Sequence, residues 1–434
     1  MKKVAVIGAG YAGLAVSIGL AHCNIKVRCI DIDERKIGQL SQGSVPIHEP
    51  EMEEMLRRQL AARRLTFSTD MIAGIKEADV IFIAVGTLGQ EKGAPDVTAI
   101  FSVVDTIAQH VRKDVVIAIK STVPPGTCEA VQARLREQVS SRFVCDVVAN
   151  PEFLREGQAL RDFLEPERIV LGGADERAIT VMQELYASFS AAGVPFYTTD
   201  WRTSEMIKYS ANSFLAMKVT FINEIARLCD AVGADVKVLT KALGADPRIG
   251  NQHLSPGPGY GGSCLPKDTE ALALFARQAG APLAIIEAVI ESNRLQQKYV
   301  VEKMKREWSS MQGLCITVYG LAFKANTDDM RESPAIPVID QLLAEGVQVC
   351  VYDPQAMNKA CEIWGERVRY GMDAYDAAVG AHALVILTDW QEFTELHVDR
   401  LERIMAEKVI FDFRNACEAG IWRRHGFRYI GIGV

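Results

Sequence analysis

The sequence predicts an α/β protein in which two sheet-containing domains are joined by a central helical segment. Short apolar strands alternate with helical patterns at both ends of the chain, which is typical of parallel sheets covered by helices. Residues 201–232 contain no proline or glycine and carry apolar residues at helical spacing, which predicts one long helix. With 434 residues, the chain is too long for one ordinary core. We therefore expect domains at 1–200, 201–306 and 307–434.

Composition and charge narrow the possible functions. Apolar residues make up 49% of the chain and the net charge is −7, so nothing favours binding to nucleic acid or to an anionic membrane surface. No apolar run approaches the ~20 residues of a membrane span, and the N-terminal run resembles a strand and turn rather than a signal peptide. The ten cysteines show no zinc spacing, so we expect no metal site and a reducing, cytoplasmic location.

The N-terminal segment carries a dinucleotide-binding pattern. An apolar strand at 3–7 runs into G-A-G-Y-A-G, a helical pattern follows at 14–22, and a second strand at 27–30 ends at Asp31. A G-x-G-x-x-G motif between strand and helix, followed by an acid at the end of the next strand, indicates a Rossmann domain. The carboxylate of Asp31 would accept the ribose hydroxyls and repel a 2′-phosphate, which favours NAD over NADP.

The glycines have separate tasks in such a turn: the first permits the tight bend, the second lets the pyrophosphate approach, and the third lets the helix pack on the strand. Arg35 and Lys36 weaken the preference for NAD, because they could hold a phosphate. The expected cofactor contacts of this segment are Gly8, Gly10, Tyr11, Ala12, Gly13, Asp31 and Lys36.

Three further buried strands follow, and each ends in a polar loop. The first begins near Asp79, and the other two span residues 115–120 and 144–149. In a doubly wound sheet, the loops after the strand C-termini line the ligand crevice. We therefore expect cofactor or substrate contacts at Thr87, Thr122, Glu152 and Glu156. For Thr87, a solvated loop position is an equally good interpretation.

The central segment adds two polar positions on a helix and one in a turn. Lys208 and Asn212 lie four residues apart, so they share one stripe of the long helix, which could also be a plain solvated face. Arg248 lies in the turn D-P-R-I-G and could reach a phosphate or only water. A second helix is expected at 282–306.

Cys264 has the setting of a reactive thiol. It follows the glycine-rich run G-P-G-Y-G-G-S and directly precedes a helix that we expect at 266–278, opened by a proline. A helix N-terminus lowers the pKa of a thiol, and Lys267 adds a positive charge nearby. Asp268 lies four residues after Cys264, so both would project to the same side of a helical turn. Most cysteines are small buried apolar residues, and only this setting reverses that interpretation.

An α/β pattern returns after residue 313, with strands at 315–319, 348–352, 383–387 and 409–412. It predicts a second Rossmann-like domain that lacks a G-x-G-x-x-G motif. Lys324 and Arg331 lie in the loop after its first strand, where a diphosphate would be held.

Taken together, the motifs resemble the nucleotide-sugar 6-dehydrogenases of the UDP-glucose/GDP-mannose dehydrogenase family, most closely the members that act on UDP-glucose. The resemblance covers nearly the whole chain and rests on these runs: G-A-G-Y-A-G, K-S-T-V-P-P-G-T, N-P-E-F-L-R-E-G, E-M-I-K-Y-S-A-N, G-P-G-Y-G-G-S-C-L-P-K-D and G-L-A-F-K-A-N-T-D-D-M-R-E-S-P. It implies NAD as cofactor, UDP-glucose as substrate, a homodimer formed by the central segment, and a UDP-binding C-terminal domain.

The resemblance also implies a four-electron oxidation of the sugar C6 alcohol to a carboxylate, with two NAD⁺ and one water. Cys264 would form a thiohemiacetal and then a thioester. Lys208 and Asn212 would stabilise the C6 oxyanion. Asp268 and Thr122 would orient water, and Glu152 and Glu156 are further acid/base candidates. The implied substrate contacts are Glu152, Phe153, Leu154, Lys208, Asn212, Tyr260, Gly261, Lys324 and, from the neighbouring subunit, Arg248. The implied further cofactor contacts are Thr87, Thr122, Glu156, Lys267 and Arg331.

The chain departs from the usual family pattern at three places. It has E-P-E-M at 49–52 in place of E-P-G-L, G-T-L at 86–88 in place of G-T-P, and K-A-N at 324–326 in place of K-P-N. None of these changes removes a catalytic group. The first two lie in the cofactor domain and bear on cofactor affinity more than on the chemistry.

Other functions remain open at the level of sequence. Relatives act on GDP-mannose, UDP-N-acetylmannosamine or UDP-N-acetylglucosamine, and the GDP-mannose enzymes share the S-C-L-P-K-D core. A two-electron 3-hydroxyacid dehydrogenase would use Lys208 and Asn212 but would not need Cys264. A non-catalytic nucleotide-sugar sensor could keep the glycines and lose the thiol. The complete set of Cys264, Lys208, Asn212 and Asp268 favours the four-electron enzyme.

Overall fold

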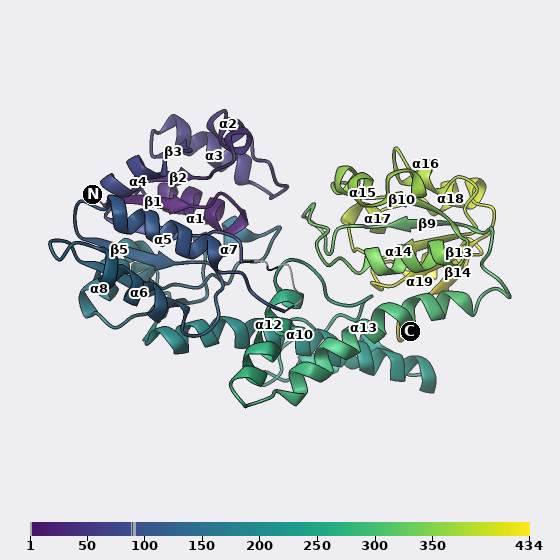
Figure 1. Ribbon diagram of the computed structural model, residues 1–434. Helices are drawn as coiled ribbons and strands as arrows, with labels where there is room; N and C mark the ends of the chain where they lie inside the picture. Colours follow the sequence, from purple (N-terminus) through teal and green to yellow (C-terminus); the bar gives the residue numbers. More distant parts are fainter. Residues whose placement is uncertain (1, 88, 90–92) are drawn as a thin grey trace. The chain divides into compact units, whose positions relative to one another are not determined.

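A computed structural model describes residues 2–87, 89 and 93–434, with the elements labelled in Figure 1. Leu88, part of one family departure, lies outside the described residues. The chain divides into two compact units, Met1–Ala211 and Asn212–Val434. The three domain ranges expected from the sequence stay a prediction.

The first unit contains an eight-stranded sheet in the order β3-β2-β1-β4-β5-β6-β7-β8. Neighbouring strands run parallel except β6 and β7, which pair antiparallel. Val4 and Val6 belong to one apolar core and Ala5 and Ile7 to another. Because side chains alternate along a strand, both faces of β1 are buried, as expected of a parallel sheet covered by helices.

The strands of this unit are β1 (Lys3–Ile7), β2 (Lys26–Ile30), β3 (Leu65–Ser68), β4 (Val80–Ile83), β5 (Val115–Ile119), β6 (Cys145–Ala149), β7 (Ile169–Gly172) and β8 (Phe196–Thr199). Its helices are α1 (Tyr11–His22), α2 (Glu34–Ser41), α3 (Met52–Ala61), α4 (Met71–Glu77), α5 (Thr98–His110), α6 (Thr127–Gln138), α7 (Ala159–Leu164), α8 (Glu176–Leu185) and α9 (Ala187–Ala191).

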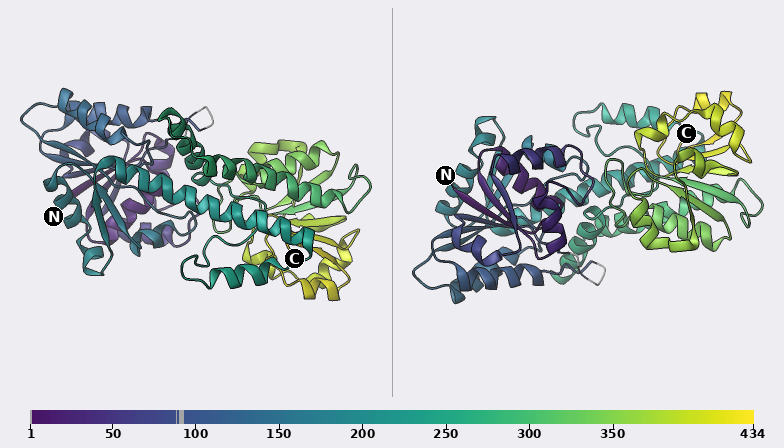
Figure 2. Two further views of the ribbon diagram at one scale, coloured as in Figure 1. Left: turned by 90° about the horizontal axis from the view of Figure 1, so that it is seen from below. Right: turned by 90° about the horizontal axis from the view of Figure 1, so that it is seen from above.

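The long helix α10 (Trp201–Val232) begins in the first unit and ends in the second (Figure 2). Its bounds are those predicted from the absence of proline and glycine. In the second unit, Ile222 and Ala226 of α10 pack in one core with Val300 and Met304 of α13. The helical elements that follow α10 are α11 (Val236–Gly244), α12 (Leu265–Gln278) and α13 (Ala284–Lys305).

The second unit contains a parallel six-stranded sheet in the order β11-β10-β9-β12-β13-β14. Numbered within this sheet, the order is that of a Rossmann fold, which confirms the predicted fold class. The strands are β9 (Cys315–Tyr319), β10 (Gln348–Tyr352), β11 (Arg369–Tyr370), β12 (Ala383–Ile386), β13 (Val409–Asp412) and β14 (Arg428–Ile430). The helices are α14 (Ala335–Ala344), α15 (Met357–Trp364), a 3-10 turn (Gly365–Arg367), α16 (Ala374–Ala378), α17 (Gln391–Thr394), α18 (Val398–Ile404) and α19 (Ala419–Arg424).

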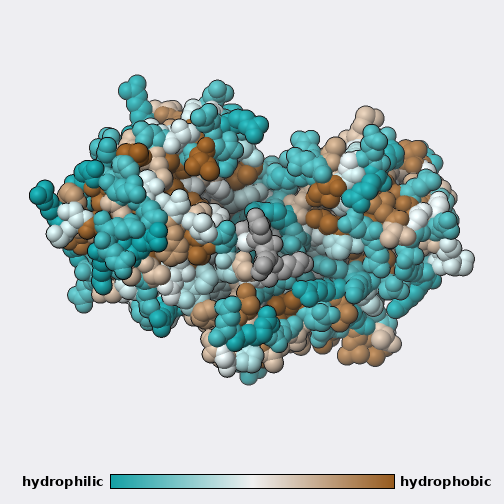
Figure 3. Space-filling model, viewed as in Figure 1, coloured by the Kyte–Doolittle hydropathy of each residue, from teal (hydrophilic) through white to brown (hydrophobic). Residues whose placement is uncertain are grey.

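Several boundaries differ from the sequence prediction by a few residues. Helix α1 begins at Tyr11 rather than 14, because Gly10 is already its extended N-cap. Helix α12 begins at Leu265 because Cys264 itself is the N-cap. Helix α13 ends one residue earlier and begins two residues later than predicted. The face drawn in Figure 3 is largely hydrophilic, with hydrophobic residues in separate groups.

Candidate active site

The glycine-rich turn after β1 is shaped by close packing at two of its three glycines. Gly8 has a φ of +104°, and a Cβ there would lie 2.4 Å from the Ala84 carbonyl oxygen. A Cβ on Gly13 would lie 1.8 Å from the Gly8 carbonyl oxygen. At Gly10, by contrast, a Cβ would meet no atom within 4 Å. The turn is therefore closed on the protein side and open at the N-terminus of α1, where an anionic group is favoured.

Asp31 lies at the end of β2 and is tied to this turn. Its carboxylate accepts hydrogen bonds from the Ala9 backbone N–H at 2.8 Å and from Lys36 Nζ at 3.1 Å. Burial alone would raise the pKa of Asp31, but these bonds and the Lys36 charge lower it. Lys36 is thus brought to the carboxylate that was expected to accept the ribose hydroxyls.

The loops after β4 and β5 meet as the sheet topology predicts. Thr87 Oγ1 donates a hydrogen bond to the Thr122 carbonyl oxygen at 3.0 Å. Thr122 also lines a small cavity of the first unit together with Pro151, Glu205 and Lys208. Thr87 is buried, so its interpretation as a solvated loop residue is wrong.

Glu152 and Lys208 form a buried ion pair. Lys208 Nζ lies 2.9 Å from Glu152 Oε1, and the two side chains are 3% and 11% exposed. The other oxygen of Glu152 accepts the Leu154 N–H at 2.6 Å. Burial alone would raise the pKa of Glu152, but the charge and hydrogen bond of Lys208 lower it, so Glu152 is a carboxylate. Lys208 is therefore not on a solvated helix face.

Phe153, the next residue of the β6 loop, lies close to two cations. The Arg168 guanidinium carbon lies 3.9 Å and Lys208 Nζ lies 5.6 Å from its ring centroid. Both distances are within the range of a cation–π interaction. The loop therefore presents Glu152 and Phe153 together at Lys208.

Glu156 lies further along the same loop and is also buried. Its neighbour Gly157 donates a backbone hydrogen bond to Glu49 Oε2 at 2.7 Å, and Ala159 donates one to Glu49 Oε1 at 2.6 Å. Glu49 thus ties the 49–52 segment to the loop that carries the two candidate acid/base residues.

Lys120 also belongs to this cluster, although it is not among the site residues predicted from the sequence. It follows β5, is 6% exposed, and donates a hydrogen bond to Asn150 Oδ1 at 3.2 Å. Burial lowers its pKa to about 8, with Glu152 acting in the opposite direction and Lys208 in the same direction. Its position within K-S-T-V-P-P-G-T was the available signal, because a lysine at a buried strand end is rare.

In the second unit, Cys264 is the N-cap of α12 and Asp268 lies one turn into the helix. The Asp268 N–H donates to the Cys264 carbonyl at 2.9 Å, which confirms the predicted helical turn. Asp268 is 1% exposed. Its carboxylate accepts a hydrogen bond from Asn212 Nδ2 at 2.6 Å and forms an ion pair with Lys267. Asn212 is therefore buried against Asp268 rather than solvated.

The glycine-rich run before Cys264 packs against the loop after β9. The Gly262 N–H donates to the Arg331 carbonyl at 3.0 Å, and a Cβ on Gly261 would lie 2.3 Å from the Glu332 carbonyl oxygen. Tyr260 is buried in this run. The structure thus places the backbone of this run against the backbone at Arg331 and Glu332.

The remaining predicted cations lie in exposed or half-buried loops. Arg331 forms a two-pronged ion pair with Asp329. Lys324 Nζ lies 5.5 Å from the ring centroid of Phe323. Arg248 is 87% exposed and its guanidinium is paired with Asp246. Within the residues that the structure describes, Arg248 forms no hydrogen bond or ion pair with another predicted site residue, so its expected role in a neighbouring subunit stays a prediction.

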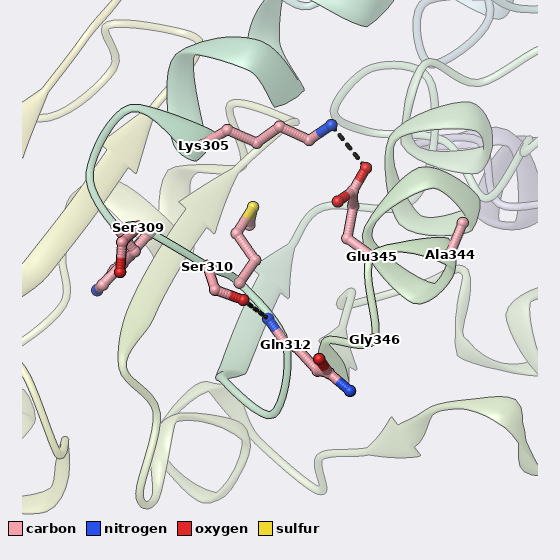
Figure 4. Close-up of a pocket in the computed structure, with 9 residues that line it drawn as sticks. Lys305, Ser309, Ser310, Gln312, Ala344, Glu345 and Gly346 are labelled. Atoms are coloured by element: carbon pink, nitrogen blue, oxygen red, sulfur yellow. Dashed lines mark hydrogen bonds and ion pairs between the residues drawn. The ribbon is translucent and has the colours of Figure 1, made fainter.

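The second unit also contains a cavity of about 520 Å³ between the ends of α13 and α14, bordered by the Lys305–Glu345 ion pair (Figure 4). Its lining residues include none of those predicted for the site. Among the described residues, no group of three or more His, Cys, Asp or Glu side chains could hold a metal ion. Across residues 2–87, 89 and 93–434, no helix has the length and apolar character needed to cross a membrane.

Comparison with known proteins assigns the family. The NAD binding domain, central domain and UDP binding domain of the UDP-glucose/GDP-mannose dehydrogenase family match residues 2–190, 202–295 and 317–419. The chain belongs to the UDP-glucose/GDP-mannose dehydrogenase family. It is therefore an NAD-dependent oxidoreductase, as the sequence predicted.

Individual relatives agree with this assignment. UDP-glucose 6-dehydrogenase TuaD of Bacillus subtilis (strain 168) is 43% identical over 433 residues, which cover 100% of this chain and 93% of the relative. The structure of a UDP-glucose dehydrogenase from Pyrobaculum islandicum superposes with a TM-score of 0.92 at 35% identity, covering 100% and 98% of the two chains. That of UDP-D-ManNAc dehydrogenase from Pyrococcus horikoshii has a TM-score of 0.85 at 27% identity, covering 99% of each.

The turn after β1 fits the NAD of this family. Its Gly10 corner leaves room for a pyrophosphate against the N-terminus of α1, while Asp31 provides an anionic acceptor at the end of β2. When bound, NAD⁺ supplies the oxidising power by accepting a hydride.

Proposed function

We propose that this chain oxidises the C6 alcohol of UDP-glucose to the carboxylate of UDP-glucuronate. UDP-glucose is favoured over other nucleotide sugars because relatives named for it share 43% and 35% of their residues with this chain, against 27% for the UDP-D-ManNAc dehydrogenase. The observation that carries the proposal is Cys264 at the N-cap of α12, with Asp268 buried one turn behind it. A two-electron dehydrogenase has no use for a thiol in this position.

Cys264 is the proposed nucleophile. After the alcohol has been oxidised to the aldehyde, the thiolate sulfur adds to C6 and the carbonyl oxygen becomes the oxyanion of a thiohemiacetal. A second two-electron oxidation of that adduct yields a thioester. Water then adds to C6, the C–S bond breaks, and the carboxylate leaves as the thiol is restored. Overall, one alcohol, two NAD⁺ and one water give one carboxylate, two NADH and three protons.

Lys208 is the proposed partner of the C6 oxygen. Glu152 holds its ammonium in place, and Phe153 provides an aromatic face beside it. A buried cation stabilises a developing oxyanion more strongly than an exposed one, since little water screens it. We assign Asn212 to the same oxygen as a hydrogen-bond donor, with Asp268 fixing its amide, and Thr122, Glu152, Glu156 and Asp268 to the handling of water and protons.

The other assignments follow the family pattern. We propose that Thr87, Lys267 and Arg331 contact the cofactor, and that Leu154, Tyr260, Gly261 and Lys324 contact UDP-glucose. We also propose a cytoplasmic location, because a catalytic thiol must stay reduced.

We further propose that the chain forms a homodimer through α10. Phe214, Phe221 and Leu228 follow one another at intervals of seven residues, so they lie on one face of the helix, and they are 57%, 49% and 57% exposed. Large exposed apolar side chains in a row mark an interaction surface. Light scattering should give twice the chain mass for the wild type and the single chain mass for Phe221→Asp. A monomeric wild type would refute the dimer.

The deciding experiment is the number of NADH formed per UDP-glucose consumed at completion, with excess NAD⁺. Two NADH per sugar are expected, and Cys264→Ser should form the aldehyde without completing the second oxidation. Cys361→Ser is a matched control, since that cysteine is exposed on α15. One NADH per sugar in the wild type would exclude the thioester route, and no NADH at all would exclude UDP-glucose as substrate.

A further inference from the structure

The segment that leads to Cys264 is an irregular loop, yet it is buried. Residues 256–262 are all buried and contain no helix or strand. Backbone N–H and C=O groups removed from water need hydrogen-bond partners, which a loop cannot supply by itself. For Gly257 and Tyr260, the partners are side chains of two helices, α10 and α13.

Three amide side chains hold the loop at two residues. Asn293 Oδ1 accepts the Tyr260 N–H at 2.8 Å, and Asn293 Nδ2 donates to the Tyr260 carbonyl at 3.0 Å. Asn223 Oδ1 accepts the Gly257 N–H at 2.8 Å, and Gln296 Nε2 donates to the Gly257 carbonyl at 2.8 Å. We name Asn223, Asn293 and Gln296 the amide clamp.

The amide clamp is itself buried. Asn223, Asn293 and Gln296 are 1%, 7% and 0% exposed. Arg227 Nη1 donates to Gln296 Oε1 at 2.6 Å, which fixes the orientation of that amide. Gly259 has a φ of +119°, and a Cβ there would lie 2.9 Å from Asn293 Oδ1, so the loop is fitted closely to Asn293.

We propose that Asn293 is a positioning residue for Cys264: by pairing with both backbone groups of Tyr260, it fixes the loop from which the nucleophile enters α12. This inference rests on the proposed role of Cys264 as nucleophile. Only Gly261, Gly262 and Ser263 separate Tyr260 from Cys264, so a displaced Tyr260 backbone displaces the thiol. A displacement of about 1 Å lowers the rate of a step at that thiol by roughly a hundredfold.

A positioning role of Asn293 predicts a different ratio of NADH to sugar from the one that simple destabilisation of the fold predicts. Loss of folded enzyme reduces both oxidations equally and leaves two NADH per sugar. Misplacement of the thiol impairs the second oxidation in addition, because the first does not involve sulfur; a shifted Tyr260 contact with UDP-glucose slows both oxidations alike. The ratio of NADH to sugar, with the aldehyde trapped by hydroxylamine, therefore separates positioning from stability.

The test compares Asn293→Asp and Asn293→Leu with Lys298→Ala, a control on an exposed position of the same helix. The aspartate keeps an acceptor for the Tyr260 N–H but removes the donor to the Tyr260 carbonyl, whereas leucine removes both. We expect the NADH ratio to fall from two towards one in both variants, further for leucine, and the second oxidation to slow by roughly a hundredfold. Asn293→Gln keeps an amide side chain, so its NADH ratio should lie between those of the wild type and Asn293→Leu. Lys298→Ala should behave as wild type.

A second measurement needs no substrate. Iodoacetamide labelling of Cys264 in the intact protein, followed by mass spectrometry, gives the alkylation rate of that thiol. We expect this rate to change by at least about tenfold in Asn293→Leu, since the thiol leaves its helix N-cap position. A ratio that stays at two, or an unchanged alkylation rate in folded variants, would overturn the inference. If the wild type does not oxidise UDP-glucose, the proposed function fails and the alkylation rate alone decides the role of Asn293.

Discussion

Replacement of Lys120 by methionine should stabilise the protein at neutral pH. Lys120 is buried, and its Nζ donates a hydrogen bond to Asn150. Burial lowers its pKa from 10.5 to about 8. A tenfold change in proton affinity corresponds to about 1.4 kcal/mol, so a protonated Lys120 costs the folded state about 3 kcal/mol relative to the unfolded chain. Methionine fills a similar volume without a charge.

The net gain is smaller because the hydrogen bond to Asn150 is lost. Asn150 Oδ1 keeps its second bond, from the Tyr186 hydroxyl at 2.8 Å, so the loss is about 1 kcal/mol. We therefore expect Lys120→Met to gain roughly 2 kcal/mol at pH 7. The same variant should lose activity, because the cluster around Glu152 and Lys208 loses one of its cations.

The pH dependence has a definite sign. Below pH 8, Lys120 is protonated in both states and its full cost is present. Between pH 8 and 10.5 the unfolded chain binds the proton and the folded state does not, so wild-type stability rises with pH. The advantage of Lys120→Met should shrink over this interval, vanish before its upper end and become a deficit of about 1 kcal/mol there, because the variant still lacks the hydrogen bond to Asn150.

Hydrogen exchange of the amides in β5 and β6 measures the free energy of opening this part of the sheet. Lys26→Met is the control, since Lys26 is an exposed lysine at the start of β2. A variant no more stable than wild type at pH 7, or a wild type whose stability does not rise between pH 8 and 10.5, would refute the reasoning.

Three further predictions follow from local geometry. Glu51 is exposed and has a φ of 63°, a left-handed conformation that costs a non-glycine residue about 1 kcal/mol. Glu51→Gly should therefore raise the midpoint of thermal unfolding, and an unchanged or lower midpoint would argue against backbone strain at this position. Lys303 lies 2.7 Å from Asp230 and is 12% exposed, so Asp230→Asn leaves a nearly buried cation without its counter-ion. The free energy of unfolding measured with denaturant should fall by about 3 kcal/mol, and an unshifted unfolding midpoint would contradict this. Gly13→Ala should lower both stability and NAD affinity, because a Cβ there meets the Gly8 carbonyl oxygen. Gly10→Ala should lower NAD affinity alone, by roughly tenfold or more in calorimetry, because a Cβ there enters the space left for the pyrophosphate. Equal effects of the two variants on stability would contradict these roles of the two glycines.

The strongest sequence patterns predicted the fold to within a few residues. The bounds of α10 match the prediction because 32 residues without proline or glycine leave no internal stop signal. The strands β3, β7, β8, β11 and β14 were not predicted. Strand β8 is only four residues long and has no fully buried residue, so its sequence shows neither a continuous apolar run nor a clear alternation.

The site residues that carry chemistry were easier to predict than those that hold them. Cys264 and Asp268 lie four residues apart within one motif, so their proximity follows from helical geometry. Asn293 reaches Tyr260 across 33 residues of sequence, and one sequence gives no signal for such a tertiary contact. In the sequence of α13, Asn293 is indistinguishable from an ordinary polar residue on a helix surface, so the amide clamp was not predicted.

The E-P-E-M departure shows how a motif can change without loss of chemistry. Its first residue, Glu49, is buried and accepts the backbone N–H groups of Gly157 and Ala159, next to the candidate acid/base residue Glu156. Its third residue, Glu51, points to solvent and occupies the left-handed conformation that suits the glycine of the usual E-P-G-L pattern. The departure therefore affects backbone strain, whereas the side chain that supports the site is retained. In this motif the site is spared because the Glu49 side chain makes the contacts with the Glu156 loop, whereas residue 51 contributes a backbone conformation at the start of α3.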